Sequence, residues 1–309
     1  MVFGDLIADV YTYGRVARVS REAPVLILEY DATQVLPGGA GNAANNVASL
    51  GATATLVSLA GRDDPGRRVL RALPPRVNRK AVLRPGGYAT PVKQRILAGG
   101  IHSAKQQVVR LDSAVATVTD KQRAVAERAL RKAVKGADAL LVSDYGSGLV
   151  TPALVARMAK RLRIPVLVDS RYALADYRGL TACTPNESEV ERALNVTIDD
   201  QLPVLERAGR ALLKRTRMKA VLITRGSRGM ALFEQGKRTV HIPIFGSDQI
   251  ADVTGAGDTV MAAMTLALAA GATFEEAARL ANYAGGLVVM KRGTATVSAA
   301  ELRRAITHG

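Results

Sequence analysis

The chain has 309 residues, 48% of them hydrophobic and 23% charged, a composition typical of a globular protein with room for one large domain or two small ones. Its longest apolar helix candidate is far below the ~20 residues of a membrane span, and its N-terminus leads into a strand-like segment rather than a signal peptide. We therefore expect a cytoplasmic protein without a membrane partner. The one cysteine, Cys183, excludes an internal disulfide framework, and three widely separated histidines make a zinc site unexpected.

The charge balance is strongly basic, with 43 Lys and Arg against 27 Asp and Glu and a net charge of +16. Such a balance favours anionic partners: nucleotides, sugar phosphates or nucleic acids. The basic residues form no consecutive block, and aromatic residues make up only 4% of the chain, with no Trp. Clustered basic residues or stacking aromatics usually mark nucleic-acid surfaces, so we expect small anionic ligands and no nucleic acid.

Residues 2–10 have the composition of a short strand running into a turn, with Asp5 and Asp9 spaced i, i+4 around its end. Two interpretations are open for these acids. They could be turn formers, or their carboxylates could accept hydrogen bonds from the hydroxyls of a sugar.

Residues 11–36 and 88–112 lack helical periodicity and are rich in alternating and β-branched residues, which predicts strands in both, the second segment turning at Gly99-Gly100. Because both segments lie outside a regular β/α alternation, we expect a small sheet set on the main body. Lys93 and Arg95 are two positions apart and therefore share one face of a strand. Together with Arg110 they are candidates for binding a phosphate carried by the substrate, and the alternative is solvated surface charge.

Between these segments, the string Pro37-Gly-Gly-Ala-Gly-Asn-Ala-Ala-Asn-Asn46 leads into a predicted helix. Gly38 and Gly39 would let a polyol approach the backbone closely. Asn42 and Asn46 lie one helical turn apart and present two side-chain amides on one face. This pattern favours a sugar-binding segment.

The same glycines also match a dinucleotide-binding fingerprint formally, as Gly39-x-Gly41-x-x-Ala44. That fingerprint needs a strand immediately before it and an acidic residue about 20 positions later, closing a second strand. Here Pro37 precedes the glycines, and the acids near the right distance, Asp63 and Asp64, fall in a predicted turn. The pattern therefore disfavours a nicotinamide dinucleotide site.

From Asp120 onward the chain alternates regularly between predicted helices and short apolar strands. The helices are expected at 121–134, 154–162 and 202–217, and the strands at 139–143, 165–168, 180–184 and 220–224. Continuous apolar strands between helices predict a parallel sheet covered on both faces. Ligands of such sheets bind beyond the carboxyl ends of the strands, where this sequence places Asp144, Asp169, Asn186, Glu189 and the loop 224–229.

The pair Asn186-x-x-Glu189 has two interpretations. It could begin a helix after the turn at Thr184-Pro185, with acids favoured in the first turn. It could also place a Mg²⁺ through water molecules beside nucleotide phosphates, because Mg²⁺ prefers few protein oxygens and several waters.

The stretch Ala251–Thr259 lies between a polar segment and the long apolar run 260–270, which has the composition of a buried helix. Gly255, Ala256 and Gly257 therefore fall at a helix start, where unpaired backbone N–H groups and the helix dipole favour an anion. A carboxylate at this place, Asp258, would repel the anion unless it accepts the proton of the attacking group. The alternative is an ordinary first-turn acid before a core helix.

The whole string Asp252-Val-Thr-Gly-Ala-Gly-Asp-Thr259 closely resembles the C-terminal signature of the ribokinase-like (PfkB) carbohydrate kinases, and Pro37–Asn46 resembles their N-terminal signature. The resemblance covers essentially the whole chain. It implies an α/β fold, a ribokinase-like three-layer αβα sandwich with a mostly parallel central sheet and a small β-sheet lid. It further implies one domain over residues 1–309, with lid segments at about 11–36 and 88–112.

The resemblance also implies roles for individual residues. Asp258 is the catalytic base, and the backbone of Gly255, Ala256 and Gly257 lines the anion hole. The implied sugar contacts are Asp5, Asp9, Gly38, Gly39, Asn42 and Asn46, and the implied ATP contacts are Asn186, Thr224, Gly226, Gly229 and Asn282. Asn186 and Glu189 would place Mg²⁺ through waters, Asp252 and Thr254 would help to hold a monovalent cation such as K⁺, and the lid could join two copies into a homodimer.

Several further strings resemble family members that phosphorylate D-glycero-β-D-manno-heptose 7-phosphate to the 1,7-bisphosphate for lipopolysaccharide synthesis. They are Gly4-Asp5, Tyr13-Gly14, Ser20-x-Glu22-Ala23-Pro24-Val25, Arg110-Leu111-Asp112, Ser143-Asp144-Tyr145, Asp176-Tyr177-Arg178-Gly179, Thr184-Pro185-Asn186 and Thr296-x-Ser298. Those relatives carry a lysine where this chain has Ser147, and Asp-Pro-Lys where it has Asp169-Ser170-Arg171. A kinase for another sugar or nucleoside, or a non-catalytic sugar- or nucleotide-sensing protein on the same fold, is therefore the alternative. Retention of Asp258 favours an enzyme.

Overall fold

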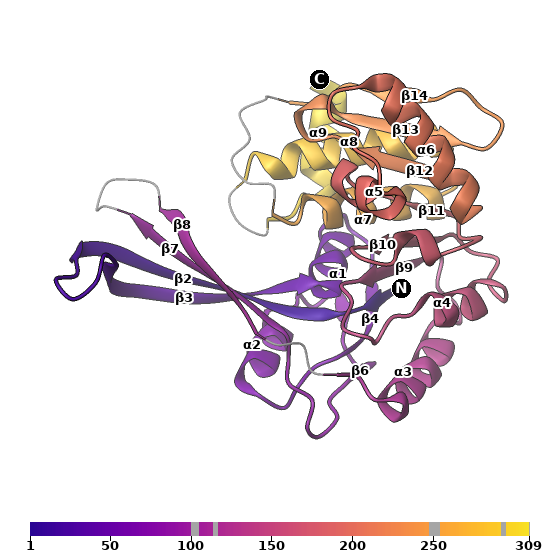
Figure 1. Ribbon diagram of the computed structural model, residues 1–309. Helices are drawn as coiled ribbons and strands as arrows, with labels where there is room; N and C mark the ends of the chain where they lie inside the picture. Colours follow the sequence, from indigo (N-terminus) through magenta and orange to yellow (C-terminus); the bar gives the residue numbers. More distant parts are fainter. Residues whose placement is uncertain (100–104, 114–116, 247–253, 292–294, 309) are drawn as a thin grey trace.

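The protein consists of a main body, a β-sheet with helices on both faces, and a second, smaller sheet that projects from it (Figure 1). The structure is a computed structural model, and it describes residues 1–99, 105–113, 117–246, 254–291 and 295–308. Among these residues, no helix is long and apolar enough to cross a membrane.

The central sheet has ten strands in the described part of the chain, in the order β14-β13-β12-β11-β10-β9-β1-β4-β5, with β6 also paired to β4. Neighbouring strands from β12 to β5 run parallel, whereas β13 and β14 form an antiparallel edge. The prediction of a mostly parallel sheet is therefore confirmed. The strands are β1 Val2–Gly4, β4 Ala54–Leu59, β5 Val77–Asn78, β6 Val82–Leu83, β9 Leu140–Asp144, β10 Val166–Ser170, β11 Ala182–Cys183, β12 Ala220–Thr224, β13 Met230–Glu234 and β14 Val240–Ile242.

Helices cover both faces of this sheet, and successive strand residues face opposite helix layers. Leu141 and Leu167 belong to one core cluster with buried residues of α1, α7 and α8, whereas Val142 and Val168 belong to a second with residues of α3, α4 and α6. This alternation is the expected result of burying a parallel sheet on both sides. The predicted three-layer αβα sandwich is confirmed. The helices are α1 Ala40–Ser49, α2 Asp64–Ala72, α3 Asp120–Ala133, α4 Pro152–Ala159, α5 Glu187–Leu194, α6 Leu202–Thr216, α7 Ala256–Ala269, α8 Phe274–Val289 and α9 Ala299–His308.

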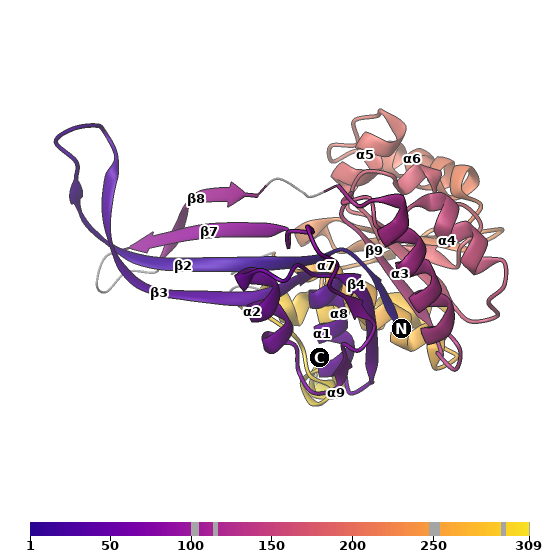
Figure 2. The ribbon, with the colours of Figure 1, turned by 90° about the horizontal axis from the view of Figure 1, so that it is seen from below.

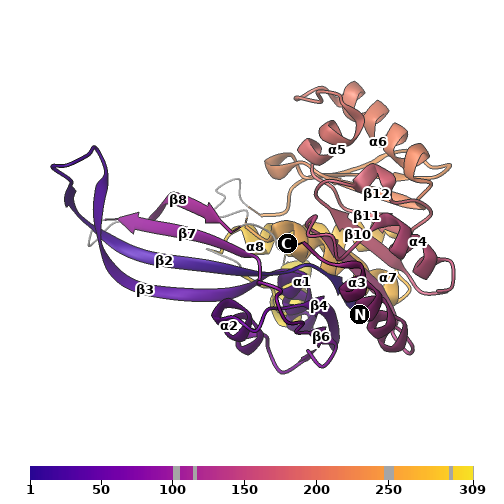
Figure 3. The ribbon, with the colours of Figure 1, turned by 60° about the horizontal axis from the view of Figure 1, so that its bottom comes forward.

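The small sheet has four strands in the order β3-β2-β7-β8, namely β3 Leu26–Gly39, β2 Leu6–Val19, β7 Val92–Gly99 and β8 Gln106–Asp112. Figures 2 and 3 show it extending away from the helical layers, with the turn between β2 and β3 farthest from the body. Apart from residues 20–25, 88–91 and 105, the described parts of both predicted lid segments are strands of this sheet, and Gly100 of the predicted turn lies outside the described residues. The strands extend beyond the predicted bounds of the first segment, since β2 begins at Leu6 and β3 ends at Gly39.

Three local predictions were wrong. Residues 2–10 contain no turn in the structure: β1 passes into β2 with only Asp5 between them. Asp63 and Asp64 do not form a simple turn, because Asp63 caps the N-terminus of α2 by accepting a hydrogen bond from Gly66 N at 2.9 Å. Pro37 lies within β3, which is an edge strand and therefore tolerates a missing N–H group.

Candidate active site

A cavity of about 700 Å³ lies at the carboxyl ends of β9, β10 and β12. Residues that are far apart in the sequence line it: the segments Thr184–Glu189 and Thr224–Met230, and the first turn of α7. This is the edge at which parallel α/β sheets bind ligands. All the residues predicted to contact the nucleotide line this cavity, namely Asn186, Thr224, Gly226, Gly229 and Asn282.

The first turn of α7 forms one wall of this cavity. Gly255 is the N-cap residue and has a φ of 80°, a left-handed conformation that favours glycine. A Cβ atom placed on Gly257 would meet no atom within 4 Å, so the backbone there faces open space. The N–H groups of this turn lack intrahelical partners. The geometry therefore fits an anion cradle beside Asp258.

Asp258 is buried at 5% exposure, and its carboxylate is held by a polar network. Asn42 Nδ2 on α1 donates to Asp258 Oδ2 at 2.7 Å. Asn46 Nδ2 donates in turn to the Asn42 side-chain oxygen at 3.2 Å, and Thr259 Oγ1 donates to Asn46 Oδ1 at 2.8 Å. The network locks Asn42 so that its NH₂ group, rather than its oxygen, faces the carboxylate.

Burial raises the pKa of Asp258 to about 7, against the lowering effects of the Asn42 hydrogen bond and of the nearby Tyr145 side chain. Asp9 raises this pKa further, and Lys93 lowers it. A carboxyl group with a pKa near neutrality is well matched to accept a proton at physiological pH.

A second cavity of about 200 Å³ lies on the other side of Tyr145, between the small sheet and the main body. Asp5 lines it at 3% exposure and accepts hydrogen bonds from Tyr145 N at 2.8 Å, Ser147 N at 3.2 Å and the Ser147 hydroxyl. Burial raises the pKa of Asp5 to about 6, and the hydrogen bonds from Ser147 oppose this shift. Asp5 is thus a fixed acceptor in a partly enclosed polar cavity.

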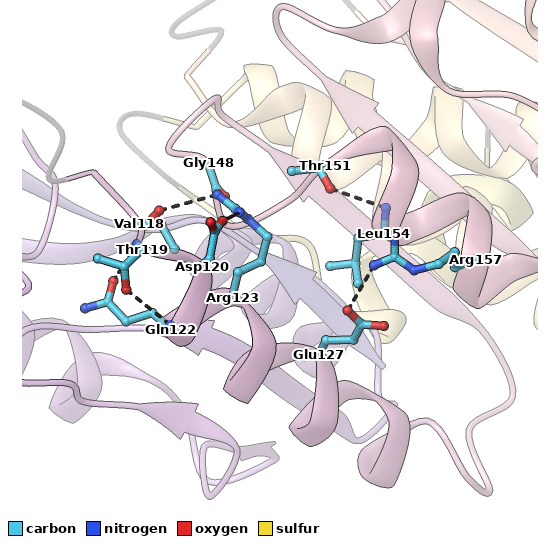
Figure 4. A network of polar contacts seen from close by, with 10 residues as sticks. All are labelled: Val118, Thr119, Asp120, Gln122, Arg123, Glu127, Gly148, Thr151, Leu154 and Arg157. Carbon is cyan, nitrogen blue, oxygen red and sulfur yellow. Dashed lines mark hydrogen bonds and ion pairs between the residues drawn. The ribbon is translucent and has the colours of Figure 1, made fainter.

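The loop that holds Asp5 is itself anchored by Arg123 on α3 (Figure 4). The Arg123 side chain donates from Nε to Gly148 O at 2.9 Å and from a terminal nitrogen to Val118 O at 3.4 Å, and it pairs with Asp120. Val118 precedes α3 on the chain segment that returns from β8. One arginine therefore connects this return segment to the loop beside Asp5.

The sequence of residues 1–301 matches the pattern of the family described as pfkB family carbohydrate kinase. The chain belongs to this family. It is 40% identical over 309 residues to the bifunctional protein HldE of Geobacter sulfurreducens, an alignment that covers 98% of this chain and 61% of the relative. It is 39% identical over 308 residues to the bifunctional protein HldE of Klebsiella pneumoniae, covering 99% of this chain and 63% of the relative. The chain thus spans less than two thirds of the length of these curated relatives.

Solved structures of two kinases share the fold. Phosphofructokinase-2 from Escherichia coli in complex with potassium superposes with a TM-score of 0.80 at 20% sequence identity, covering 100% of this chain and 98% of that chain. Arabidopsis thaliana ribokinase in complex with ribose and ATP gives a TM-score of 0.76 at 22% identity, with the same coverage. The ribokinase-like fold predicted from the sequence is therefore confirmed.

In this pfkB-family chain, Asn186 and Glu189 form a capping box at the start of α5. Glu189 N donates to Asn186 Oδ1 at 2.9 Å, and Asn186 N donates to Glu189 Oε2 at 3.0 Å. Glu189 also lines the large cavity beside Asp169, and burial together with the charge of Glu189 raises the pKa of Asp169 well above its usual range. Asn186 and Glu189 can therefore begin a helix and still be placed to bind Mg²⁺ through waters, so the two interpretations of this pair are compatible.

Two oxygens of these neighbouring carboxylates fit a divalent cation chemically, because bound Mg²⁺ would relieve their mutual repulsion. Among the described residues, no three His, Cys, Asp or Glu side chains form a ready metal cluster. A cation here would need further oxygens from phosphates and water. Of the predicted monovalent-cation ligands, Asp252 lies outside the described residues, and the role of Thr254 stays a prediction.

The cations predicted to bind substrate separate into two groups. Lys93 and Arg110 line the smaller cavity. Arg95 does not line it, because Arg95 Nη1 pairs with Asp9 Oδ1 at 2.7 Å. Arg171, which keeps the positive charge of the lysine found there in the heptose kinases, lines both cavities. The substrate roles themselves stay predictions.

Gly38 and Gly39 serve the packing of β3 against β2. A Cβ atom on Gly38 would lie 2.2 Å from Asp9 Oδ2, and one on Gly39 would lie 2.4 Å from Asp5 O, with Gly39 at a φ of 55°. Only glycine fits so close to these two acids. The predicted approach of a polyol to this backbone is untested, and the structure supplies a different reason for the glycines.

Asn42 and Asn46 were predicted to contact the sugar. Both are 0% exposed, and their amides bond to Asp258, Thr259 and each other. The structure therefore favours a positioning role. Sequence reasoning missed this role. It also missed that Tyr145 lines both cavities, although Tyr145 follows a strand end, the place where such sheets bind ligands.

Proposed function

We propose that this chain transfers the γ-phosphoryl group of ATP to a hydroxyl of D-glycero-β-D-manno-heptose 7-phosphate. The observation that carries the proposal is the position of Asp258. It lies beside the first-turn amides of α7 and lines the large cavity. Its pKa, raised to about 7 by burial, suits a general base.

The choice of a phosphorylated heptose rests on two supports. Strings such as Ser143-Asp144-Tyr145 resemble those of heptose 7-phosphate kinases, and the Geobacter and Klebsiella relatives are both bifunctional proteins named HldE. The smaller cavity also carries Lys93, Arg110 and Arg171 beside Asp5 and Asp112. Three cations against two acids suit a ligand with hydroxyls near one end and a phosphate at the other.

The proposed reaction is a direct in-line transfer. Asp258 accepts the proton of the attacking sugar hydroxyl, and the amides of Gly255, Ala256 and Gly257 stabilise the charge that develops on the transferred phosphoryl oxygens. Asn42 holds the Asp258 carboxylate in place. The small sheet excludes water, which would otherwise be an alternative acceptor.

Mg²⁺ bound near Asn186 and Glu189 would offset phosphate charge, and K⁺ near Asp252 and Thr254 would support the α7 turn. We further propose that the enzyme works in the cytoplasm, where ATP is available, as a homodimer joined through the small sheet. The dimer proposal rests on exposed apolar residues of that sheet, namely Val16, Val19, Leu26, Tyr30, Val108, Val109 and Leu111.

A screen of ATP consumption against sugars and sugar phosphates tests this function. We expect the highest kcat/KM with heptose 7-phosphate, and a kcat for Asp258→Asn that is lower by a factor on the order of 10²–10⁴. ATP turnover with a different sugar would support the proposed kinase activity and contradict heptose 7-phosphate as the substrate. Tight binding of sugar or ATP with no turnover would favour a sensing protein instead.

A further inference from the structure

Arg171 lies at the boundary between the two cavities. It follows β10 directly and lines the larger cavity together with Asp258 and the smaller one together with Asp5. Within the described chain, Tyr145 is the other residue that lines both cavities. Arg171 is therefore the shared cation of the described residues, placed to meet a group that passes from one cavity to the other.

Three other cations of the two cavities are already paired with carboxylates. On the nucleotide side, Glu187 accepts hydrogen bonds from Arg225 Nε at 2.9 Å and from Arg228 Nη2 at 2.5 Å. On the sugar side, Arg110 pairs with Asp112 at 2.6 Å. Each of these arginines would have to give up a carboxylate contact before it could bind a phosphate with the same donors.

The Arg171 guanidinium, in contrast, forms no hydrogen bond or ion pair with any residue in the described part of the chain. Its backbone is held on both sides: Arg171 N donates to Asp144 O at 3.1 Å, and Arg192 Nη1 donates to Arg171 O at 2.8 Å. The guanidinium lies 6.0 Å from the centre of the Tyr172 ring, at the outer limit of a cation–π contact. A firmly held backbone thus carries a guanidinium whose donors are available to a ligand.

The acids near Arg171 explain why a cation is useful at this boundary. Burial is the main cause that raises the pKa of Asp169 and of Glu189, and the charge of Arg171 opposes both shifts. A phosphoryl group that approaches Asp258 brings further negative charge into the same cavity. A fixed cation beside its path would offset that charge.

We propose that Arg171 is a catalytic residue that binds the transferred phosphoryl group between the nucleotide and the sugar. The bond from the γ-phosphorus to the β–γ bridging oxygen breaks, and a bond from the sugar oxygen to this phosphorus forms. The hydroxyl proton goes to Asp258, and ADP leaves with the bridging oxygen. Arg171 keeps its proton and donates hydrogen bonds to the phosphoryl oxygens, over which charge is spread in the transition state. This role of Arg171 rests on the proposed function of the chain as a kinase.

Arg171→Met removes the charge and keeps an unbranched side chain. The kcat should fall by a factor on the order of 10²–10³, as when one donor to a developing charge is removed. The loss should be the same for heptose 7-phosphate and for any unphosphorylated sugar that the wild type turns over, because the contacted group comes from ATP. Arg171→Lys keeps a positive charge and should restore kcat to within ~10-fold of the wild type.

Arg163→Met is a matched control. Arg163 lies between α4 and β10, and its exposed side chain forms no hydrogen bond or ion pair with the residues that the structure describes. It lines neither cavity. The kcat of this variant should equal that of the wild type, so the effect of a lower net charge is separated from the effect of losing Arg171.

Calorimetric binding of nucleotides without sugar gives a readout that needs no turnover. The probes are ADP and an ATP analogue in which an imido group replaces the β–γ bridging oxygen. Arg171→Met should weaken binding of the analogue by ~10-fold, the loss expected for one charge-assisted hydrogen bond, and leave ADP binding unchanged. If the wild type transfers no phosphate to any sugar, the proposed function fails, while the comparison of the two nucleotides still tests the phosphate contact.

Four results would overturn the proposed role. They are equal effects of Arg171→Met on the analogue and on ADP, a wild-type kcat for Arg171→Met, and a kcat for Arg171→Lys as low as that for Arg171→Met. The fourth is a loss confined to phosphorylated sugars, which would place Arg171 at the phosphate that the sugar already carries.

Discussion

The side-chain amide of Asn42 donates a 2.7 Å hydrogen bond to the carboxylate of Asp258, although the two residues are 216 positions apart in the sequence. The bond joins α1, from the N-terminal signature of the family, to the first turn of α7, from its C-terminal signature. The two signatures therefore meet in one network. Asn42 orients the Asp258 carboxylate, and this carboxylate is the proposed proton acceptor.

Asp258→Asn should lower kcat by a factor on the order of 10²–10⁴, the usual range for a positioned general base, with little change in ATP affinity. Single-turnover kinetics on the purified variant would measure the loss. Asp64→Asn is a suitable control, because Asp64 is also a first-turn acid, on α2, with a side chain 62% exposed. Turnover of Asp258→Asn at the wild-type rate would remove Asp258 from the mechanism.

The same substitution should stabilise the protein at alkaline pH. The folded-state pKa of Asp258, about 7, lies above the ordinary aspartate value of 3.8, so the folded state binds this proton more tightly than the unfolded state. Stability from this group is therefore present below pH ~4 and is lost as the pH rises to ~7. Asp258→Asn should unfold at higher denaturant concentration than wild type at pH 8, and the difference should shrink toward pH 4.

The pH dependence of kcat/KM should show two ionisations on its acid side. Rate should fall below pH ~7 as Asp258 is protonated, and more steeply below pH ~6 as Asp5 is protonated too, because burial raises both pKa values. A logarithmic plot should pass from a slope of about one to a slope of about two. A profile that stays flat to pH 5 would contradict both assignments.

Glu189→Gln should raise the Mg²⁺ concentration needed for half-maximal rate, since one anionic oxygen near the phosphates is lost. Gln can still accept from Asn186 N, so the capping box survives. Glu276→Gln is a close control, because Glu276 has the same capping-box position on α8 and accepts from Thr273 N at 2.8 Å. Identical Mg²⁺ titrations for Glu189→Gln and Glu276→Gln would place the metal elsewhere.

Lys93→Met should lower kcat/KM for heptose 7-phosphate by ~10–100-fold, the loss expected for one charge-assisted bond. An unphosphorylated sugar should be much less affected. Arg95→Met should behave differently: it leaves the buried Asp9 carboxylate unpaired, so stability and turnover of both substrates should fall together. Equal effects of Lys93→Met on the two substrates would argue against a phosphate in the smaller cavity.

Leu26→Asp should weaken the proposed dimer, because Leu26 is one of the exposed apolar residues of the small sheet. Sedimentation velocity over a range of concentrations would detect the shift to monomer. Leu202→Asp, on α6 of the main body, changes an exposed leucine outside that sheet and should leave the association unchanged. A wild-type protein that is monomeric at all concentrations would contradict the dimer.

Local signals in the sequence were sufficient to predict the layer architecture and the helix start at Gly255. Strand and helix periods determine which face each residue buries, and Gly255–Asp258 carries the helix start and the acid within four positions. Four of the nucleotide-side residues, Asn186, Thr224, Gly226 and Gly229, lie together because they are at or after the ends of the neighbouring strands β11 and β12, whereas Asn282 reaches the same cavity from α8. Such predictions depend on contacts that are close in sequence or imposed by the topology.

Other features depend on contacts that no local pattern specifies. Asn42 carries both a donor and an acceptor, and only the position of Asp258 and Asn46 in space decides which of them faces the base. Lys93 and Arg95 look equivalent on one strand. In the pairing of β2 with β7, Asp9 lies opposite Lys93, yet its carboxylate pairs diagonally with Arg95. Asp5 was predicted to lie beside a turn. In the structure it lies in an extended segment, where its carboxylate accepts hydrogen bonds from the backbone N–H groups of Tyr145 and Ser147.

Helices α1 and α7 also bear on the order in which the chain becomes active. Their hydrogen bonds close a loop of more than 200 residues, which forms slowly compared with the local turns of either helix. During synthesis the N-terminal part is released first, so Asn42 and Asn46 lack their partners on α7 until the last third of the chain has emerged. After dilution from denaturant, recovery of kinase activity should therefore lag behind recovery of the helical circular dichroism signal. Activity would then report the completed contact between α1 and α7, and not the earlier collapse of the chain.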